Sequence, residues 1–140
     1  MKVFIYLFIL LLTVKSLHAQ PTVLGKSEAN AREIIGKTDA KFIYKDTVSD
    51  KESVLTYVVL DKNESVITIF LYFTNNKCTL YQLKYSIPHL NEIVKELNED
   101  HTQIKTGEWT TKNLAYKIKL RFNTTDKKDS AFFYVDYYKN

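Results

Sequence analysis

Hydrophobic residues in this chain recur at two different spacings, one typical of helices and one of β-strands. The clearest strand lies at residues 114–122, where apolar side chains alternate with Ala115 and three cationic residues. The clearest helix lies at residues 87–99, where the apolar residues from Leu90 to Leu97 follow the i, i+3, i+4, i+7 pattern. The chain therefore alternates between sheet-forming and helix-forming segments.

The remaining segments predict one further helix and several further strands. Ser27 is a suitable N-cap for a short helix, and Asn75-Asn76 is a tight hairpin signal because Asn tolerates positive φ. The predicted helices are residues 27–36 and 87–99; the predicted strands are residues 41–45, 53–60, 65–74, 77–85, 114–122 and 131–138, with a polar loop at 123–130. This order, α-β-β-β-β-α-β-β, predicts an α+β domain with two helices on an antiparallel sheet of about six strands.

The segment Ser65–Phe73, SVITIFLYF, is apolar at both odd and even positions. As a strand it directs Phe70 and Tyr72 to one face and Ile69 and Leu71 to the other. An antiparallel sheet with one face in water has polar residues on that face, and this strand has few. Either a helix covers each face of the sheet, or the sheet curls around its own core, or both helices cover the same face and the other face is an interaction surface.

The first nineteen residues predict a secretory signal peptide. Lys2 precedes the apolar run Val3–Val14, and Ala19 is a suitable small residue for cleavage before Gln20. The run is shorter than the roughly 20 apolar residues that a membrane span needs. We therefore expect an exported domain of residues 20–140, periplasmic or extracellular in a Gram-negative bacterium, with no membrane span after cleavage.

Charge and cysteine content narrow the classes of partner. The 140-residue chain has a formal charge of +4, and removal of Lys2 and Lys15 with no acidic residue leaves +2. This excess is too small to predict nucleic-acid binding. Cys78 is the only cysteine, so no intramolecular disulfide forms, and a buried apolar role is expected for its thiol.

Familiar catalytic and metal-binding motifs are absent from the sequence. His89 and His101 lack zinc-ligand spacing, and the glycines at 25, 36 and 107 are isolated from one another. No G-x-S-x-G motif occurs, and no pair of carboxylates is singled out for acid–base chemistry. We therefore predict a protein that is not an enzyme and that uses no metal or cofactor.

Candidate binding residues come from aromatic and cationic side chains of the predicted sheet. Three aromatic residues, Tyr57, Phe70 and Tyr72, suit an interface because their rings are apolar, and the tyrosine hydroxyls tolerate water. Trp109 is either a partner anchor or a lid over the helix–sheet core. A row of cations on one strand face meets either solvent or an acidic partner or anionic glycan; this row is Lys117, Lys119 and Arg121.

The segment GKSEANAREIIGK, residues 25–37, resembles the opening helix of small exported bacterial domains of the β-lactamase-inhibitor-protein-like type. Gly25, Ser27 and the sequence Ile34-Ile35-Gly36 carry the resemblance. Lys37 stands where proline often follows the glycine in that family, and no lipid-anchor cysteine is present. The resemblance implies a protein-binding module that docks through its sheet, and it transfers no functional residues.

Two functions follow as the main hypotheses, and a third is a hydrolase whose site is assembled from residues distant in sequence. The first is an exported, non-enzymatic domain that binds a protein partner or a second copy of itself through one sheet face. The alternative is a binding or carrier module for an apolar or glycan ligand, which predicts that Tyr57, Phe70 and Tyr72 line one closed cavity.

Overall fold

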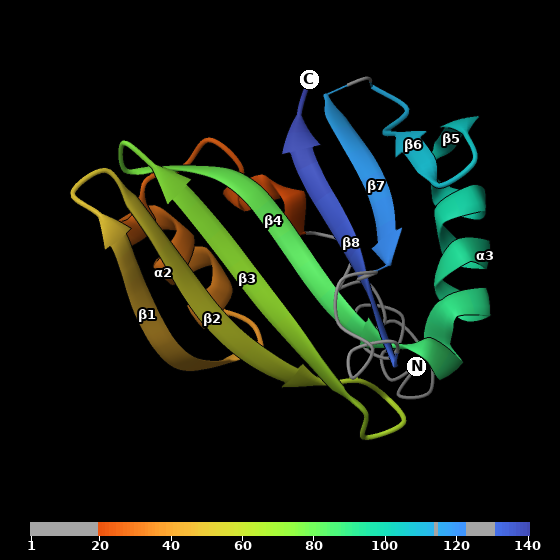
Figure 1. The fold of residues 1–140 in the computed structure, drawn as a ribbon, viewed down its shortest axis with the longest axis horizontal. Coiled ribbons are helices and arrows are strands. Elements are labelled where there is room, and N and C mark those ends of the chain that lie inside the picture. The colour runs from red at the N-terminus through yellow and green to blue at the C-terminus, as the bar shows by residue number, and fades with distance from the viewer. Residues whose placement is uncertain (1–19, 114, 123–130) are drawn as a thin grey trace, which may run out of the picture.

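The structure is a computed structural model that describes residues 20–113, 115–122 and 131–140. The predicted signal peptide at 1–19 and the predicted polar loop at 123–130 lie outside the described residues. The described residues form an α+β fold with two α-helices and one antiparallel sheet of eight strands (Figure 1). The elements are η1 (Gln20–Val23), α2 (Glu28–Gly36), β1 (Lys41–Ser49), β2 (Glu52–Leu60), β3 (Val66–Thr74), β4 (Lys77–Ser86), η2 (Ile87–His89), α3 (Leu90–Asp100), β5 (Thr102–Lys105), β6 (Glu108–Thr110), β7 (Tyr116–Phe122) and β8 (Phe132–Lys139).

The sheet is built from two halves with the same order of elements. In each half an α-helix is followed by four strands, and the strand order across the sheet is β1-β2-β3-β4-β8-β7-β6-β5. The halves join where β4 pairs antiparallel with β8, so β1 and β5 form the two edges. Figure 1 shows α2 behind β1–β4 and α3 beside the half that contains β5–β8.

The prediction of about six strands was wrong, because two short strands follow the second helix. β5 and β6 have four and three residues, too few to show a two-residue hydrophobic period. Gly107 connects them with φ +76°, a conformation that glycine adopts without steric cost. β7 then holds this turn in place, since the Leu120 N–H donates to the Gly107 carbonyl at 2.9 Å.

The tight hairpin between β3 and β4 is confirmed. Asn75 and Asn76 have φ values of 50° and 59°, as a two-residue turn of this kind requires. The Asn76 side chain has a second role, because its Oδ1 accepts the Glu28 N–H at 3.1 Å. The hairpin therefore supplies an acceptor for one of the free N–H groups at the start of α2.

Both helices contribute to one hydrophobic core. Ala31 and Ile35 of α2 are fully buried, and Leu97 of α3 is buried at the opposite end. The sheet contributes fully buried side chains from its central strands, among them Leu55, Ile69, Leu71, Phe133 and Val135. Burying side chains of this size contributes about 1.5–3 kcal/mol each, so this core supplies most of the stability.

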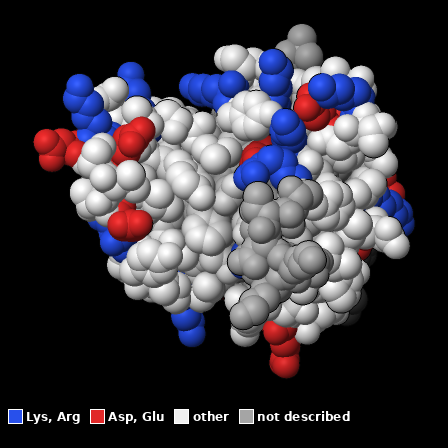
Figure 2. Space-filling model, viewed as in Figure 1, with Lys and Arg blue, Asp and Glu red and all other residues white. Residues whose placement is uncertain are grey.

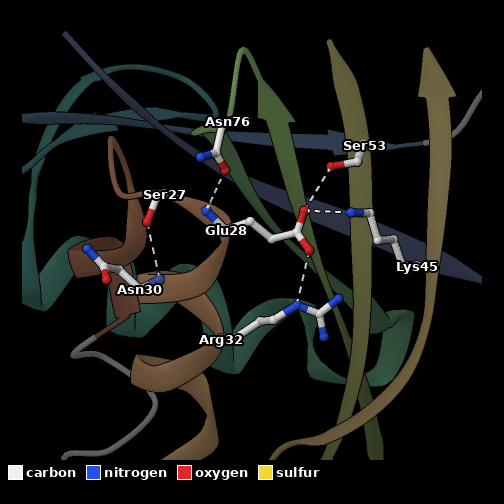
Figure 3. A network of polar contacts seen from close by, with 7 residues as sticks. All are labelled: Ser27, Glu28, Asn30, Arg32, Lys45, Ser53 and Asn76. Carbon is white, nitrogen blue, oxygen red and sulfur yellow. Dashed lines mark hydrogen bonds and ion pairs between the residues drawn. The ribbon is translucent and has the colours of Figure 1, made fainter. Parts of the chain in front are cut away.

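A polar network fixes α2 to the first two strands (Figure 3). The predicted cap is confirmed, because Ser27 Oγ accepts the Asn30 N–H at 3.3 Å. The Glu28 carboxylate accepts from Arg32 at 3.1 Å, and from Lys45 on β1 at 2.9 Å. Ser53 on β2 donates to the same carboxylate at 3.4 Å. Partial burial raises the pKa of Glu28, but the hydrogen bonds from Lys45 and Arg32 outweigh it and the net pKa is lowered.

Glu28→Gln should destabilise the protein by about 1 kcal/mol at pH 7. Because the folded pKa of Glu28 is lowered, its stabilisation is present above the ordinary glutamate pKa of about 4.3 and is lost as pH falls through the folded value. Urea unfolding of both proteins between pH 7 and pH 3 measures this difference. A gap that stays constant down to pH 3 would contradict the assignment.

Candidate functional site

The register of the strands shows which face each side chain occupies. One row of directly paired residues crosses the sheet from β3 to β6. Its members, in order across β3, β4, β8, β7 and β6, are Leu71, Tyr81, Tyr137, Ile118 and Trp109. Directly paired residues point to the same side of a sheet, so these five side chains share one face.

Both helices pack on this same face. The Trp109 Nε1–H donates to Asn98 Oδ1 of α3 at 2.8 Å. At the other end of the sheet, the Arg32 guanidinium of α2 lies 4.7 Å from the ring centroid of Phe42. Phe42 pairs with Tyr57, and Tyr57 pairs with Ile69, two residues from Leu71 on β3. α2 and α3 therefore cover the same face of the sheet, and neither helix covers the opposite face.

We call the side of the sheet that neither α2 nor α3 covers the open face. Its central members on β2–β4 are Val54, Thr56, Val58, Thr68, Phe70, Tyr72, Leu80, Gln82 and Lys84, and those on β6–β8 are Glu108, Thr110, Lys117, Lys119, Arg121, Phe132, Tyr134, Asp136 and Tyr138. Phe70, Tyr72 and Tyr134 are half-buried, and Val66 at the end of β3 is exposed. An open sheet face with this many apolar and aromatic side chains is typical of an interaction surface.

The structure divides the seven predicted binding residues between the two faces. Five of them lie on the open face: Phe70, Tyr72, Lys117, Lys119 and Arg121. Tyr57 and Trp109 lie on the helix-covered face, with 4% and 1% of their surface exposed. Trp109 is therefore a lid over the core, and Tyr57 is separated from Phe70 and Tyr72 by the sheet itself.

A chain of hydrogen bonds crosses four strands at the centre of the open face. The Tyr72 hydroxyl donates to Gln82 Oε1 at 3.2 Å, and Gln82 Nε2 donates to Asp136 Oδ1 at 2.8 Å. Arg121 Nε donates to Asp136 Oδ2, and its Nη2 reaches Oδ1 at 3.4 Å. Gln82 and Asp136 are only 4% and 5% exposed, so these contacts satisfy groups that would be costly to leave unpaired.

The network affects the ionisation of its two outer members. Burial raises the pKa of the Tyr72 hydroxyl, the negative charge of Asp136 raises it further, and the cation of Arg121 opposes both. The hydrogen bond that Arg121 donates to Asp136 raises the pKa of Arg121, which stays a cation. Both groups are thus held in their ordinary charge states, as hydrogen-bond donors.

Aromatic rings and cations alternate next to this network. The Tyr134 ring centroid lies 5.9 Å from Lys84 Nζ on one side and 5.7 Å from Arg121 Cζ on the other. Lys84 Nζ also lies 4.2 Å from the ring centroid of Phe132. These distances are typical of cation–π interactions, which hold Lys84 and Arg121 close to the sheet surface.

Gln82 and Asp136 were not among the predicted site residues. Each is the one strongly polar residue within an otherwise aromatic or aliphatic stretch, YQL and YVDYY. That pattern indicates a polar side chain that needs a partner, but only the pairing of β4 with β8 shows that the two residues face each other.

Cys78 is a buried free thiol, as expected. Burial raises its pKa to about 12. Among the described residues, no group of three or more His, Cys, Asp or Glu side chains could hold a metal ion.

Cys78 should react with a thiol reagent at pH 8 at least about 100-fold more slowly in the native protein than in urea, because the thiolate is scarce and shielded. Absorbance of the released thiolate dye over time measures both rates. Equal rates in the two conditions would contradict burial of the thiol.

Within residues 20–113, 115–122 and 131–140, no helix is long and apolar enough to cross a membrane. Comparison with protein-family models, with curated proteins and with solved structures finds no match to this chain. The resemblance of residues 25–37 to β-lactamase-inhibitor-protein-like domains stays a prediction.

Proposed function

We propose that the chain is an exported, non-enzymatic domain that binds a protein partner through the open face of its sheet. The observation that carries the proposal is the placement of both helices on the same side. Neither α2 nor α3 covers the opposite side, which carries Phe70, Tyr72 and Tyr134. The predicted signal peptide is the support for export.

The residue types on the open face support protein binding. Tyrosine, phenylalanine and arginine are enriched in protein interfaces, since they combine apolar area with directional hydrogen bonds. Asp136 holds Arg121 in one orientation through two of its donors, so less side-chain entropy is lost when a partner binds. A sheet face bearing such residues suits a protein surface.

The alternative ligand-carrier function receives less support. It predicts one closed cavity lined by Tyr57, Phe70 and Tyr72, whereas the sheet separates Tyr57 from the other two. Protein binding needs no such cavity.

Site-specific photo-crosslinking in cells that produce the protein tests the proposal. A photoreactive residue at Val58 or Thr68 on the open face should give one discrete adduct of higher mass. The matched controls are Lys95 and Glu99 on the outer side of α3, whose side chains are 75% and 62% exposed. Adducts from neither open-face position, or equally from both sides, would reject the proposed docking face.

A further inference from the structure

The open face has more cations than carboxylates. Inward of the edge strand β1, the described residues on this face include more cations than carboxylates: the cations are Lys77, Lys84, Lys105, Lys117, Lys119 and Arg121, and the carboxylates are Glu52, Glu108 and Asp136. Glu108 and Asp136, the two carboxylates on the β6–β8 side, are already engaged by cations of the protein. Asp136 pairs with Arg121, as described above, and Glu108 lies 3.3 Å from Lys105 and 3.8 Å from Lys119. Among the residues that the structure describes, the face therefore has positive charge that the protein's own carboxylates do not neutralise.

The charge is concentrated on one side of the face. Lys117, Lys119 and Arg121 occupy alternate positions of β7, at intervals of about 7 Å. Phe70 and Tyr72 lie on β3, three strand spacings away, or about 14 Å across the sheet. Figure 2 shows Lys and Arg atoms gathered over the β7–β8 side and a largely uncharged area over β2–β4. A surface that fits this face is apolar on one side and negatively charged on the other.

We propose that the partner of the open face is an acidic protein segment whose apolar side chains pack on β2–β3 and whose carboxylates meet the cations of β7. This inference rests on the proposed function and specifies the partner. Lys117 is exposed, so it reaches a partner's carboxylate without rearrangement of the sheet.

A second copy of the chain fits this face poorly. If two open faces meet with their cationic sides together, like charges repel across the interface. If the cations of one copy meet the apolar area over β3 and β4 of the other, they lose water without gaining a carboxylate, because Asp46 and Glu52 lie farther out on β1 and β2. Charge complementarity therefore favours a different, acidic protein over self-association.

Binding of designed peptides to residues 20–140 tests the inference. The probe is a labelled 20-residue amphipathic peptide with leucine on one stripe and glutamate on the next, and its control has glutamine at every glutamate position. Fluorescence anisotropy should show at least ten-fold tighter binding of the acidic peptide. The preference should shrink in 0.5 M NaCl, because salt screens these charges.

Matched variants locate the effect on the protein. The triple variant Lys84→Gln, Lys117→Gln, Lys119→Gln should lose the ten-fold preference. The control variant Lys37→Gln, Lys62→Gln, Lys95→Gln removes three lysines that are not on the open face, whose side chains are 72–75% exposed, and should keep it. Melting curves of both variants check that they are folded.

Four results would overturn the inference: no binding of either peptide, equal binding of the two, a preference that survives in the triple variant, or tighter binding of a single-stranded oligonucleotide than of the acidic peptide. Light scattering that shows a concentration-dependent dimer would also overturn it, in favour of a second copy. Photo-crosslinking at Val58 and Thr68 tests docking itself. Crosslinked adducts together with no preference for the acidic peptide would reject the acidic partner and leave the proposed protein-binding function standing.

Discussion

Trp109→Ala should destabilise the protein by about 3–5 kcal/mol, the largest effect expected for any single substitution here. Trp109 is 1% exposed and is the largest of the fully buried side chains in the described core. It lies between Ile118 on β7 and α3, so its removal leaves a cavity that the short strand β6 cannot close. Urea unfolding followed by circular dichroism measures the loss.

Asn98→Ala is the matched control for the hydrogen bond of the Trp109 indole. It removes the acceptor 2.8 Å from Nε1 but leaves the ring in place, and it should cost only about 0.5–1.5 kcal/mol. A partner anchor would behave differently, because truncating an exposed tryptophan weakens binding and leaves stability nearly unchanged. Stability of Trp109→Ala within 1 kcal/mol of the wild type would contradict its place in the core.

Most individual helices and strands could be predicted from the sequence, because a long periodic pattern of apolar residues is formed by residues that are close together in the chain. The alternation in β7 and the helical stripe from Leu90 to Leu97 belong to this class. β5 and β6 were missed because three or four residues hold too little pattern, and they form strands only by pairing with each other and with β7. Tertiary pairing, rather than local preference, defines them.

The coverage of the two sheet faces could not be predicted from SVITIFLYF alone. The side chains on both sides of β3 are mostly apolar, so the pattern is compatible with helices on one face of the sheet or on both faces. The side on which a helix packs depends on the direction of its connections and on distant contacts, such as Glu28 with Lys45 and Asn98 with Trp109. The same reason explains why Tyr57 and Phe70, thirteen positions apart, were grouped together although they lie on opposite faces.

Arg121→Met should destabilise the protein by about 3 kcal/mol, because it leaves the charge of a buried carboxylate without its cation. Of the side-chain donors in the described part of the chain, Gln82 alone would still donate to Asp136, at 2.8 Å. Its side chain is 7% exposed, so water cannot replace the lost donors, whereas the Arg121 side chain is 45% exposed. The asymmetry predicts that Asp136→Asn costs less than Arg121→Met, since an unpaired Arg121 can be hydrated.

Lys119→Met is the matched control on the same strand. Lys119 is 3.8 Å from Glu108 in a partly exposed ion pair, and its loss should cost less than about 1 kcal/mol. The double variant Arg121→Met, Asp136→Leu should recover much of the stability, because a buried ion pair can often be replaced by apolar side chains. Urea unfolding of all four variants measures these differences. If Arg121→Met and Lys119→Met cost the same, Asp136 is hydrated in the folded protein, and Arg121 is then a mobile surface cation rather than one that the fold orients toward a partner.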